Sequence, residues 1–445
     1  MSEQLAGDKK ETQAQAPLES YIREPRSIEE TELTMGFLAD LTLKLIYYKS
    51  DMSSVEIAEA LTLPFRSVME KVLEFLKREE YVEISGSKGF GERGYQWLIT
   101  GKGSERALQA LERDQYIGPA PVPLERYNEM VLRQSLGDLK VKPDDVQKAV
   151  SHLVLPAELI NRLGPAVNSG RSLFLYGPPG NGKTVVAKSI IRMLKGNIYI
   201  PHTVIVDGQI IRLYDEMNHK RIDNPSNQTS RREIGSGASG RLDPRWVRIR
   251  RPEIIVGGEL AMTSLDLIYD PISKTYEAPF QMKANTGLFV IDDFGRLAMR
   301  PQDLLNRWIV PLELRVDFLT LQTGKKIEVP FDQLIVFSTN LDPRELVDDA
   351  FLRRIRHKLK IDFPDEKTYY EILQRECATH NMDLPPEAFV YLMQKHYLAT
   401  NRELRACHPR DILDQIQDIA SYLGVRPVLS KQLIDAACAG YFAKL

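Results

Sequence analysis

Residues 177–184 combine three glycines with a lysine and a hydroxyl residue at the spacing of a phosphate-binding loop. Glycine lets the backbone curl until several N–H groups point at one phosphate chain. The lysine can then reach the β- and γ-phosphates, and the hydroxyl can ligate Mg²⁺. The segment predicts a site for ATP and Mg²⁺, built from Gly177, Pro178, Pro179, Gly180, Asn181, Gly182, Lys183 and Thr184.

Carboxylate and amide side chains follow two further apolar segments, as they would at the ends of buried strands. Asp292 and Asp293 come directly after residues 288–291, and Asn340 follows residues 334–339. Ligands of α/β proteins bind at the carboxyl ends of parallel strands. We therefore expect Asp292 to hold Mg²⁺, together with the hydroxyl of the loop. We expect Asp293 to orient or deprotonate an attacking water, and Asn340 to lie near the γ-phosphate.

Two arginine positions could complete such a site. Arg353 and Arg354 follow an acidic helix start at residues 348–349. An arginine there can reach across a subunit boundary and neutralise charge on the γ-phosphate. Arg410, in the first turn of a predicted helix, could contact the nucleotide within its own subunit. Charged clusters are commonly solvated, so an exposed basic surface is the alternative for both positions.

In this order the motifs resemble those of an AAA+ ATPase, over residues 141–445. The resemblance implies Walker A at 177–184, Walker B at 288–293, sensor 1 at Asn340, an arginine finger at Arg353 or Arg354, and sensor 2 at Arg410. Arg354 is the preferred finger because the apolar Ile355 follows it. The family implies a P-loop core, with a parallel sheet flanked by helices, and a C-terminal helical lid. It also implies Mg-ATP hydrolysis in a homo-oligomeric ring, with a hexamer as the expected form.

The whole chain is also similar to bacterial winged-helix AAA+ ATPases that are loosely described as chaperone-like and associated with pilus assembly. The leading hypothesis is therefore hydrolysis of ATP to remodel a protein partner. One position departs from the family pattern, because Asp293 stands where glutamate is usual and is shorter by one methylene. Since proton-transfer geometry is strict, slow turnover follows. A nucleotide-gated assembly scaffold is the corresponding alternative.

The rest of the chain predicts the elements that position these residues. Residues 172–176 are an apolar run typical of a buried strand, and residues 184–194 have helical spacing, so the phosphate loop lies between a strand and a helix. Alternating strands and helices after a helical region at 144–163 favour a parallel sheet. The predicted segments are a disordered tail at 1–27, a winged helix-turn-helix domain at 28–115, a Pro-rich linker at 116–140, an α/β nucleotide-binding core at 141–364 and a helical lid at 365–445.

Residues 28–115 show three helical stretches followed by two strand-like runs around a Gly-rich turn. That order is similar to a winged helix-turn-helix domain, for which DNA binding is the usual interpretation. The third helical stretch, residues 64–80, balances Arg and Lys with Glu, whereas a helix that docks on phosphates should be basic. We therefore favour a protein contact, and an ATP-controlled DNA-binding regulator is the alternative.

A basic insertion at 220–258 precedes the strand that ends at Asp292. Within it, residues 235–240 are rich in Gly and Ser, and Trp246 begins a run that could pair with residues 253–256 as a hairpin. One hypothesis is a loop in the central pore of the ring, where Trp246 grips an acidic polypeptide or nucleic acid. The alternative is a solvated basic loop with the hairpin packed on the core.

Composition narrows the function classes. The 445 residues carry a formal net charge of −2 and three cysteines. This charge gives no general attraction to nucleic acid or to membranes. The cysteines lack a paired spacing, which predicts reduced thiols, and the scattered histidines predict no zinc site. No apolar run approaches about 18 residues and the N-terminus lacks an apolar core, so we expect a cytoplasmic protein without membrane insertion.

Overall fold

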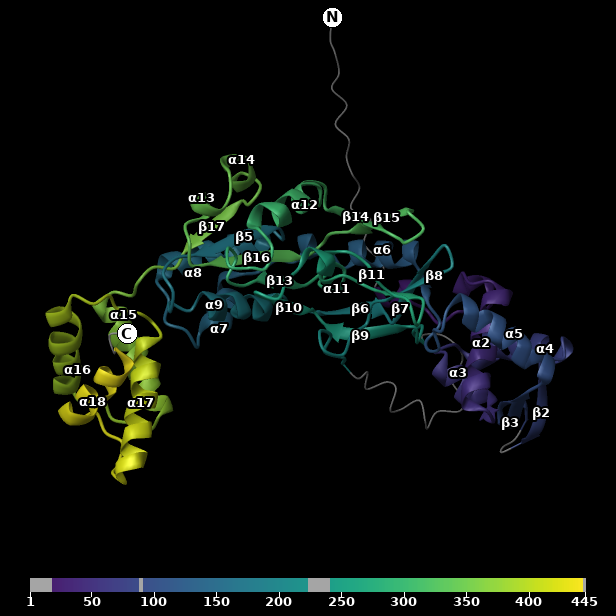
Figure 1. Cartoon of the computed structure of the whole chain (residues 1–445), viewed down its shortest axis with the longest axis horizontal. Coiled ribbons are helices and arrows are strands. Elements are labelled where there is room, and N and C mark those ends of the chain that lie inside the picture. Colours follow the sequence, from purple (N-terminus) through teal and green to yellow (C-terminus); the bar gives the residue numbers. More distant parts are fainter. Residues whose placement is uncertain (1–17, 88–90, 223–240, 443–445) are drawn as a thin grey trace, which may run out of the picture.

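The central element of the computed structural model is a parallel sheet of five strands (Figure 1). The structure describes residues 18–87, 91–222 and 241–442. The strands lie in the order β10, β13, β16, β5, β17, and every neighbouring pair is parallel. This confirms the predicted α/β class. The strand bounds are Glu253–Val256 (β10), Leu288–Ile291 (β13), Leu334–Thr339 (β16), Ser172–Tyr176 (β5) and His357–Lys360 (β17).

Helices flank both faces of this sheet, because strand residues alternate between the faces. Leu173 and Leu175 of β5 pack in one cluster with α7, α8 and α9, whereas Phe174 belongs to a second cluster with Trp308 of α12. The helical region expected at 144–163 is two helices, since Pro156, which has no N–H to donate, precedes the second. The helix bounds are Pro143–Val150 (α7), Ala157–Asn168 (α8), Lys183–Ile190 (α9), Phe280–Lys283 (α11), Pro301–Leu314 (α12), Pro343–Leu346 (α13) and Asp349–Leu352 (α14).

A β-rich layer with its own apolar core lies between the parallel sheet and the N-terminal helices (Figure 1). Five of its strands follow the order β11, β12, β8, β7, β4, and two further pairs are β6 with β9 and β14 with β15. Helix α6 contributes Tyr127 to the same core. The bounds are Val122–Pro123 (β4), Leu124–Arg133 (α6), Asn197–Pro201 (β6), Thr203–Val206 (β7), Gln209–Arg212 (β8), Trp246–Arg250 (β9), Ile268–Asp270 (β11), Thr275–Glu277 (β12), Val316–Thr320 (β14) and Lys326–Pro330 (β15).

Two sequence predictions are wrong in this layer. Residues 116–140 are not merely a Pro-rich linker, because β4 and α6 lie within them and bury Tyr127. Strands β9 and β10 do not form a hairpin, because β9 pairs with β6 and β10 with β13. The connection between them is Arg251-Pro252. A tight hairpin turn of type I′ needs positive φ at both positions, which proline cannot adopt.

Two further expectations concern residues around Trp246. This side chain is 6% exposed and packs with Ile22 and Tyr199, so it is not available as a grip in a pore. Residues 18–27 of the predicted disordered tail are ordered, since Ile22 is fully buried. The rest of that tail, residues 1–17, lies outside the described residues. So do residues 223–240 of the basic insertion, which include the stretch rich in Gly and Ser at 235–240.

The N-terminal unit joins helices to three short antiparallel strands in the order β1, β3, β2. Thr34 caps α2, and Ser53 forms a reciprocal capping box with Glu56 at the start of α3. The predicted helices and strands occur in the predicted order, and the winged-helix assignment stays a prediction. Residues 88–90 of the turn lie outside the described residues. The bounds are Leu18–Tyr21 (α1), Met35–Lys49 (α2), Met52–Ser53 (β1), Ser54–Ala60 (α3), a π-helical turn at Phe65–Met69 continued by Glu70–Arg78 (α4), Val82–Ser87 (β2), Tyr95–Ile99 (β3) and Gly101–Arg113 (α5).

A buried arginine, paired with a nearby aspartate, joins the N-terminal unit to the β-rich layer. Arg245 and Asp243 are each 1% exposed at the side chain and lie 2.7 Å apart. The same guanidinium donates to the carbonyl oxygens of Thr31 and Pro121, at 2.9 and 3.2 Å. Removing one partner of a buried ion pair typically costs about 3–5 kcal/mol. The two parts are therefore linked by hydrogen bonds from a charged donor that Asp243 holds in place.

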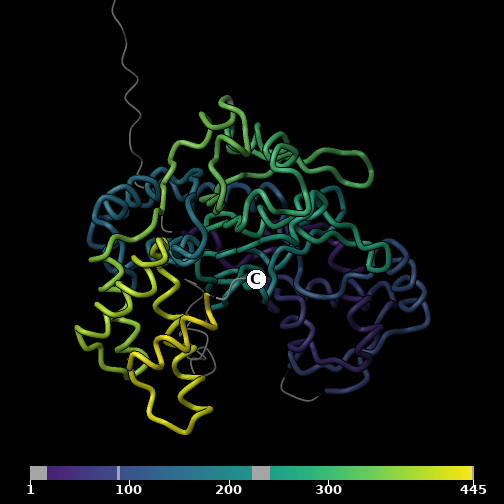
Figure 2. The backbone as a smooth tube through the Cα atoms, turned by 60° about the vertical axis from the view of Figure 1, so that its left-hand side comes forward, coloured from purple at the N-terminus to yellow at the C-terminus, as the bar shows by residue number. Residues whose placement is uncertain are grey.

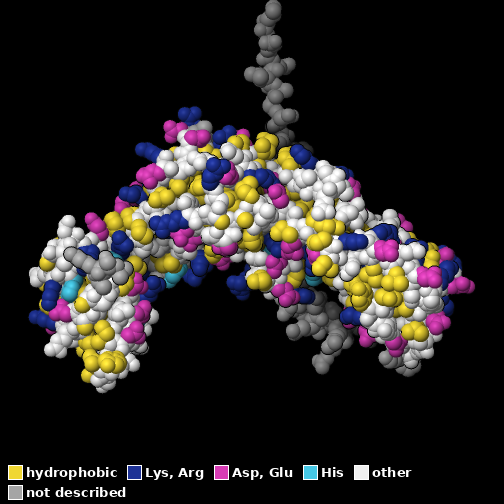
Figure 3. All heavy atoms as spheres, in the orientation of Figure 1, with side chains coloured by type: hydrophobic (Ala, Val, Ile, Leu, Met, Phe, Trp, Pro, Cys, Tyr) yellow, Lys and Arg dark blue, Asp and Glu magenta, His cyan; other side chains and the backbone are white. Residues whose placement is uncertain are grey.

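The C-terminal helices form a separate cluster at the other end of the molecule (Figures 1 and 2). Helical spacing in the sequence predicts four helices here, at 366–380, 386–397, 409–423 and 431–442, and all four occur. Their role as a lid stays a prediction. No helix in the described part of the chain has both the length and the apolarity needed to span a bilayer. Acidic and basic side chains are mixed over the face shown in Figure 3. The bounds are Glu366–Thr379 (α15), Pro386–Leu392 (α16), His408–Leu423 (α17) and Lys431–Tyr441 (α18).

Acidification should destabilise the C-terminal helices through His408. This buried ring lies with Nδ1 3.0 Å from the hydroxyl of Tyr397, and burial lowers its pKa from 6.5 to about 4. The unfolded chain binds the proton near pH 6.5 and the folded helices only near pH 4, so stability is lost as the pH falls through that window. Between pH 6.5 and 5 we expect a loss of about 2 kcal/mol.

Urea unfolding at pH 7, 6 and 5, followed by circular dichroism, measures this loss. The control is His408→Asn, which keeps a hydrogen-bonding group toward Tyr397 but does not titrate, so its pH dependence should be smaller. His202 also has a pKa lowered to about 4 by burial. The difference between the two proteins therefore reports His408, and identical pH profiles would contradict the assignment.

Candidate active site

The loop at residues 177–184 lies between β5 and α9, at the carboxyl end of the parallel sheet. Gly177, Gly180 and Gly182 have φ angles of 138°, 80° and 80°. Residues with a side chain rarely adopt such angles, and a Cβ on Gly177 would lie 2.1 Å from the carbonyl oxygen of Ile361. The curl of the loop therefore requires glycine, as in loops whose backbone N–H groups bind a phosphate.

Lys183 is held inside the curl of the loop. Its ammonium donates to the carbonyl oxygens of Gly177 and Pro178, at 2.9 and 2.8 Å. Burial lowers the pKa of this lysine, an effect that the two aspartates after β13 oppose. Gly182, the N-cap of α9, offers no side-chain cap to the first helical N–H groups. An uncapped helix N-terminus beside a lysine suits a bound phosphate.

Adjacent strands bring the predicted polar residues together. Thr184 Oγ1 donates to Asp292 Oδ2 at 2.7 Å, and Asn340 Nδ2 donates to Asp293 Oδ1 at 3.0 Å. Strand β16 lies between β13 and β5, so the three strand ends are neighbours. A hydroxyl in contact with a carboxylate oxygen is a donor set that Mg²⁺ prefers. The residues present therefore fit the predicted metal.

Asp293 has an unusual backbone conformation. Its φ is +49°, in the left-handed region that residues other than glycine seldom adopt. Two hydrogen bonds hold this turn: the N–H of Asp293 donates to Asp292 Oδ1 at 3.1 Å, and the N–H of Phe294 donates to the carbonyl of Ser338 at 2.7 Å. The turn directs the Asp293 carboxylate toward Asn340, which binds it.

The segment that leads into α17 touches the phosphate-binding loop. The N–H of Cys407 donates to the carbonyl of Gly180 at 2.9 Å, and the N–H of Ala406 donates to Asn181 Oδ1 at 3.1 Å. A Cβ on Gly180 would lie 2.7 Å from Cys407 Sγ and 3.5 Å from Arg405 Cδ. The C-terminal helices are therefore connected directly to the loop.

Arg405, which sequence reasoning missed, lies beside Gly180 of this loop. The predicted Arg410 is instead exposed and donates to Asp411 Oδ1 on its own helix, at 3.0 Å. In the sequence, Arg405 is visible only as an arginine a few residues before a predicted helix. Its position beside Gly180 results from packing between segments that are more than 200 residues apart in the chain. Contact of Arg410 with a nucleotide stays a prediction.

The two finger candidates lie away from the loop. Both follow α14, which is above the sheet in Figure 1, whereas α9 is below it. Arg353 is exposed, and Arg354 Nε donates to Glu313 Oε1 of α12 at 2.6 Å. The structure thus gathers the predicted residues of the loop, β13 and β16, and leaves both finger candidates at another edge of the chain.

Similar proteins of known identity include ATPases. Over 297 residues the chain is 23% identical to Spastin from Ixodes scapularis, which covers 65% of this chain and 34% of that protein. Over 62 residues it is 39% identical to Vesicle-fusing ATPase from Dictyostelium discoideum, which covers 14% of this chain and 8% of that protein. These relatives support an AAA+ ATPase. The chain spans a minor part of the length of each relative.

Residues 365–440, the segment predicted as the lid of the AAA+ core, match a family described as Domain of unknown function (DUF8689). Among solved structures, the RuvB Holliday junction branch migration motor of Thermotoga maritima is 14% identical with a TM-score of 0.35, covering 68% of this chain and 72% of that one. NtrX from Brucella abortus in complex with ADP is 12% identical with a TM-score of 0.38, covering 75% and 65%. Similarities at these scores carry no argument about this chain.

Gly180 and Gly182 form a matched pair for testing the contact between the loop and α17. Both have a φ of 80°, but a Cβ on Gly182 would meet nothing within 4 Å. Alanine at either position carries a similar backbone strain of about 1–2 kcal/mol. Only Gly180→Ala also pushes on Cys407, so we expect this variant to lose a further 1–3 kcal/mol or so, as overpacking usually costs about that much.

Urea unfolding and limited proteolysis of the nucleotide-free variants measure the difference. The double variant Gly180→Ala/Cys407→Ala lacks the Sγ atom that the new methyl group meets, so it should recover the additional loss. Equal destabilisation by Gly180→Ala and Gly182→Ala would show that the contact is not made.

Proposed function

We propose that this chain is an AAA+ ATPase that hydrolyses Mg-ATP in a ring-shaped oligomer and uses the cycle to remodel a protein partner. The observation that carries the proposal is the pair of hydrogen bonds at the strand ends, Thr184 to Asp292 and Asn340 to Asp293. The first bond joins the two residues that would bind the metal, and the second joins the two that would bind the water. Both pairs lie beside the phosphate-binding loop. Nucleotide binding alone would need the loop but not the second pair.

The phosphates would be bound by the loop and by the N-terminus of α9. Backbone N–H groups and the helix dipole both favour an anion there. Lys183 would exchange the carbonyl oxygens of Gly177 and Pro178 for phosphate oxygens, which are stronger acceptors because they are charged. Thr184 and Asp292 would hold Mg²⁺, which supplies neutralisation of charge on the β- and γ-phosphates.

The attacking water would be oriented by Asp293 and Asn340. The amide of Asn340 holds Oδ1 of Asp293, so the second carboxylate oxygen is the one that can accept a hydrogen bond from water. This arrangement sets the direction of the water before its proton is transferred. It is also the part of the site in which the chain departs from the usual glutamate.

An oligomer would complete the site. Charge that builds on the γ-phosphate during hydrolysis is commonly neutralised by an arginine from a neighbouring subunit. Arg354 is paired with Glu313, apart from the loop of its own chain. It would therefore serve the nucleotide of the next subunit, and a hexameric ring is the assembly that we propose.

The C-terminal helices would convert hydrolysis into movement. Because the N–H of Cys407 binds the carbonyl of Gly180, a shift of the loop on phosphate release would be passed to α17. A protein partner is favoured by relatives such as Proteasome-activating nucleotidase from Methanocella arvoryzae, which is 28% identical over 81 residues. A chaperone-like role in pilus or secretion assembly rests on the sequence resemblance.

A second candidate is a scaffold that ATP binding switches and that hydrolyses ATP slowly. The specific observation is Asp293, which is short and sits in a left-handed conformation. Aspartate tolerates that conformation better than glutamate, because its short polar side chain can bond to nearby groups. The backbone of this turn would therefore favour aspartate over glutamate. The shorter side chain would then place its carboxylate farther from the attacking water.

Variants of Asp293 separate the two candidates. Asp293→Asn should lower phosphate release by about 10²–10⁴-fold, because a general base is lost, while binding of a fluorescent ATP analogue is kept. Asp293→Glu should raise release by about tenfold if reach limits the rate. Release only from Asp293→Glu would favour the scaffold. Absence of nucleotide binding in all three proteins would refute both candidates.

Arg354→Ala should lower phosphate release at least about 100-fold without weakening ATP binding, because a transition-state cation is lost. Arg353→Ala is the matched control and should have a smaller effect. Mixing Arg354→Ala with Asp293→Asn should restore part of the activity, since some interfaces then combine an intact Asp293 with an intact Arg354. No recovery in mixed assemblies would contradict action across subunits.

A further inference from the structure

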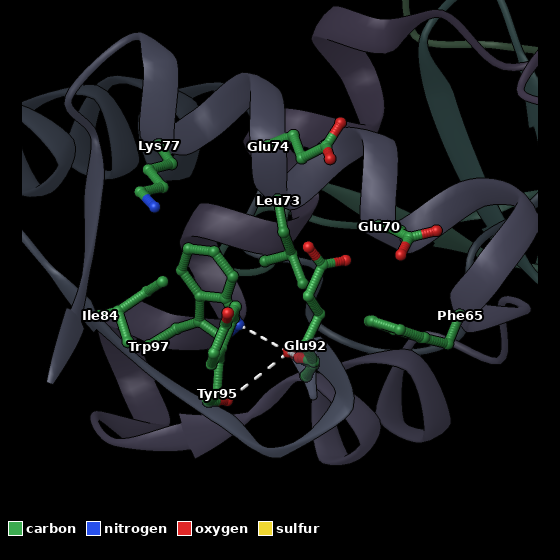
Figure 4. Close-up of a pocket in the computed structure, with 10 residues that line it drawn as sticks. Phe65, Glu70, Leu73, Glu74, Lys77, Ile84, Glu92, Tyr95 and Trp97 are labelled. Atoms are coloured by element: carbon green, nitrogen blue, oxygen red, sulfur yellow. Dashed lines mark hydrogen bonds between the residues drawn. The ribbon is translucent and has the colours of Figure 1, made fainter. Parts of the chain in front are cut away.

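A pocket of about 160 Å³ lies in the N-terminal unit, apart from the nucleotide site (Figure 4). The helical segment that ends in α4 forms one side, and the turn before β3 forms the other. Its lining combines aromatic side chains with carboxylates. None of these residues belongs to the phosphate-binding loop or to the strand ends beside it, so the pocket is a separate feature of the N-terminal unit.

Aromatic side chains form opposing walls of this pocket. Tyr95 and Trp97 of β3 stand on one side and Phe65 on the other (Figure 4). The Trp97 indole is 4% exposed and donates to Ser54 Oγ at 2.8 Å, and this hydroxyl donates to the carbonyl of Glu92 at 2.8 Å. These bonds fix the indole, so the wall is in place before any ligand arrives.

Three carboxylates gather between the walls. Glu70 and Glu74 come from the helix, and Glu92 reaches up from the turn toward them (Figure 4). A hydrogen bond with Glu92 raises the pKa of Glu70, and burial and the charges of Glu92 and Glu74 add to it, while Arg66 opposes it. Carboxylates this close repel one another when ionised, and a cation between them would remove that repulsion.

The lining side chains carry a net negative charge when ionised, because three carboxylates outnumber Lys77. Arg66 and Arg93 lie nearby, outside the lining. The guanidinium carbon of Arg93 lies 5.8 Å from the centroid of the Phe65 ring, so this ring already accepts one guanidinium. An arginine side chain is planar and can stack on such rings while it donates two parallel hydrogen bonds to a carboxylate.

Two other ligand classes fit less well. Within the described ranges, no group of three or more His, Cys, Asp or Glu side chains could hold a metal ion, so these glutamates are not spaced as a chelating set. A phosphate of nucleic acid would meet carboxylates on the helix that a winged-helix domain normally sets in the groove. A flat organic cation satisfies both the charge and the aromatic walls.

We propose that this pocket binds the side chain of an arginine on a partner protein. The site belongs to the N-terminal unit and works without nucleotide, so it goes beyond the proposed ATPase activity. It gives the unit a way to recruit a partner by one charged side chain, with specificity for guanidinium over a neutral group of the same shape.

The test uses the full-length protein without nucleotide and a capped nine-residue Gly/Ser/Ala peptide with one central arginine. Its twin carries citrulline, which has the same shape without the charge. Of the three tryptophans, Trp97 lines the pocket while Trp246 and Trp308 are buried elsewhere. With ¹⁵N-labelled tryptophan, the arginine peptide should shift the Trp97 indole signal alone. The citrulline peptide should bind at least about tenfold more weakly.

Glu74→Gln/Glu92→Gln should also weaken the arginine peptide by about tenfold, because it removes two charges but keeps the shape. The matched control is Glu83→Gln, at an exposed glutamate of β2 outside the pocket. Equal binding of both peptides, an unmoved Trp97 signal, or full binding by the double variant would overturn the proposal. So would a Trp97 shift that depends on protein concentration alone, which would assign the pocket to a second copy. Salt-sensitive binding of a DNA duplex in place of the peptide would assign it to nucleic acid.

Discussion

The hydrogen bond from Thr184 to Asp292 exists because three parallel strands end at the same edge of one sheet. Strand β16 lies between β5 and β13, so the phosphate loop, the two aspartates and Asn340 arrive side by side. An antiparallel strand would carry its terminal residue to the far edge, about 17 Å away for a strand of five residues. The polar site therefore depends on the apolar clusters that hold the two faces of the sheet in register.

This dependence explains why much of the site could be predicted from the sequence. An apolar run followed by a polar residue is a local pattern, and it located β5, β13 and β16 together with Asp292, Asp293 and Asn340. Helical spacing likewise located the C-terminal helices. These elements are long or strongly patterned, so their own residues specify them, and the parallel sheet follows from the alternation of strands and helices.

What the sequence did not predict depends on partners far along the chain. Strand β10 is apolar whether it pairs with β9 or with β13, and only the proline between β9 and β10 argues against the hairpin. The prolines near residue 120 favour a linker, so helix α6 just after them was not predicted. The helix buries Tyr127 against strands that come much later in the chain. Arg405 reaches the loop only once the C-terminal helices have docked. Side-chain periodicity holds no information about such distant contacts.

The buried pair of Arg245 and Asp243 has a mechanical consequence. The guanidinium of Arg245 is bonded to Asp243 and to the carbonyls of Thr31 and Pro121. A rotation of the N-terminal unit on the β-rich layer would break these buried hydrogen bonds. The unit should instead turn with the core as a rigid arm. A small rotation of the core would then be magnified at the tip of that arm, and a protein held there would be pulled through a longer stroke than the core itself makes.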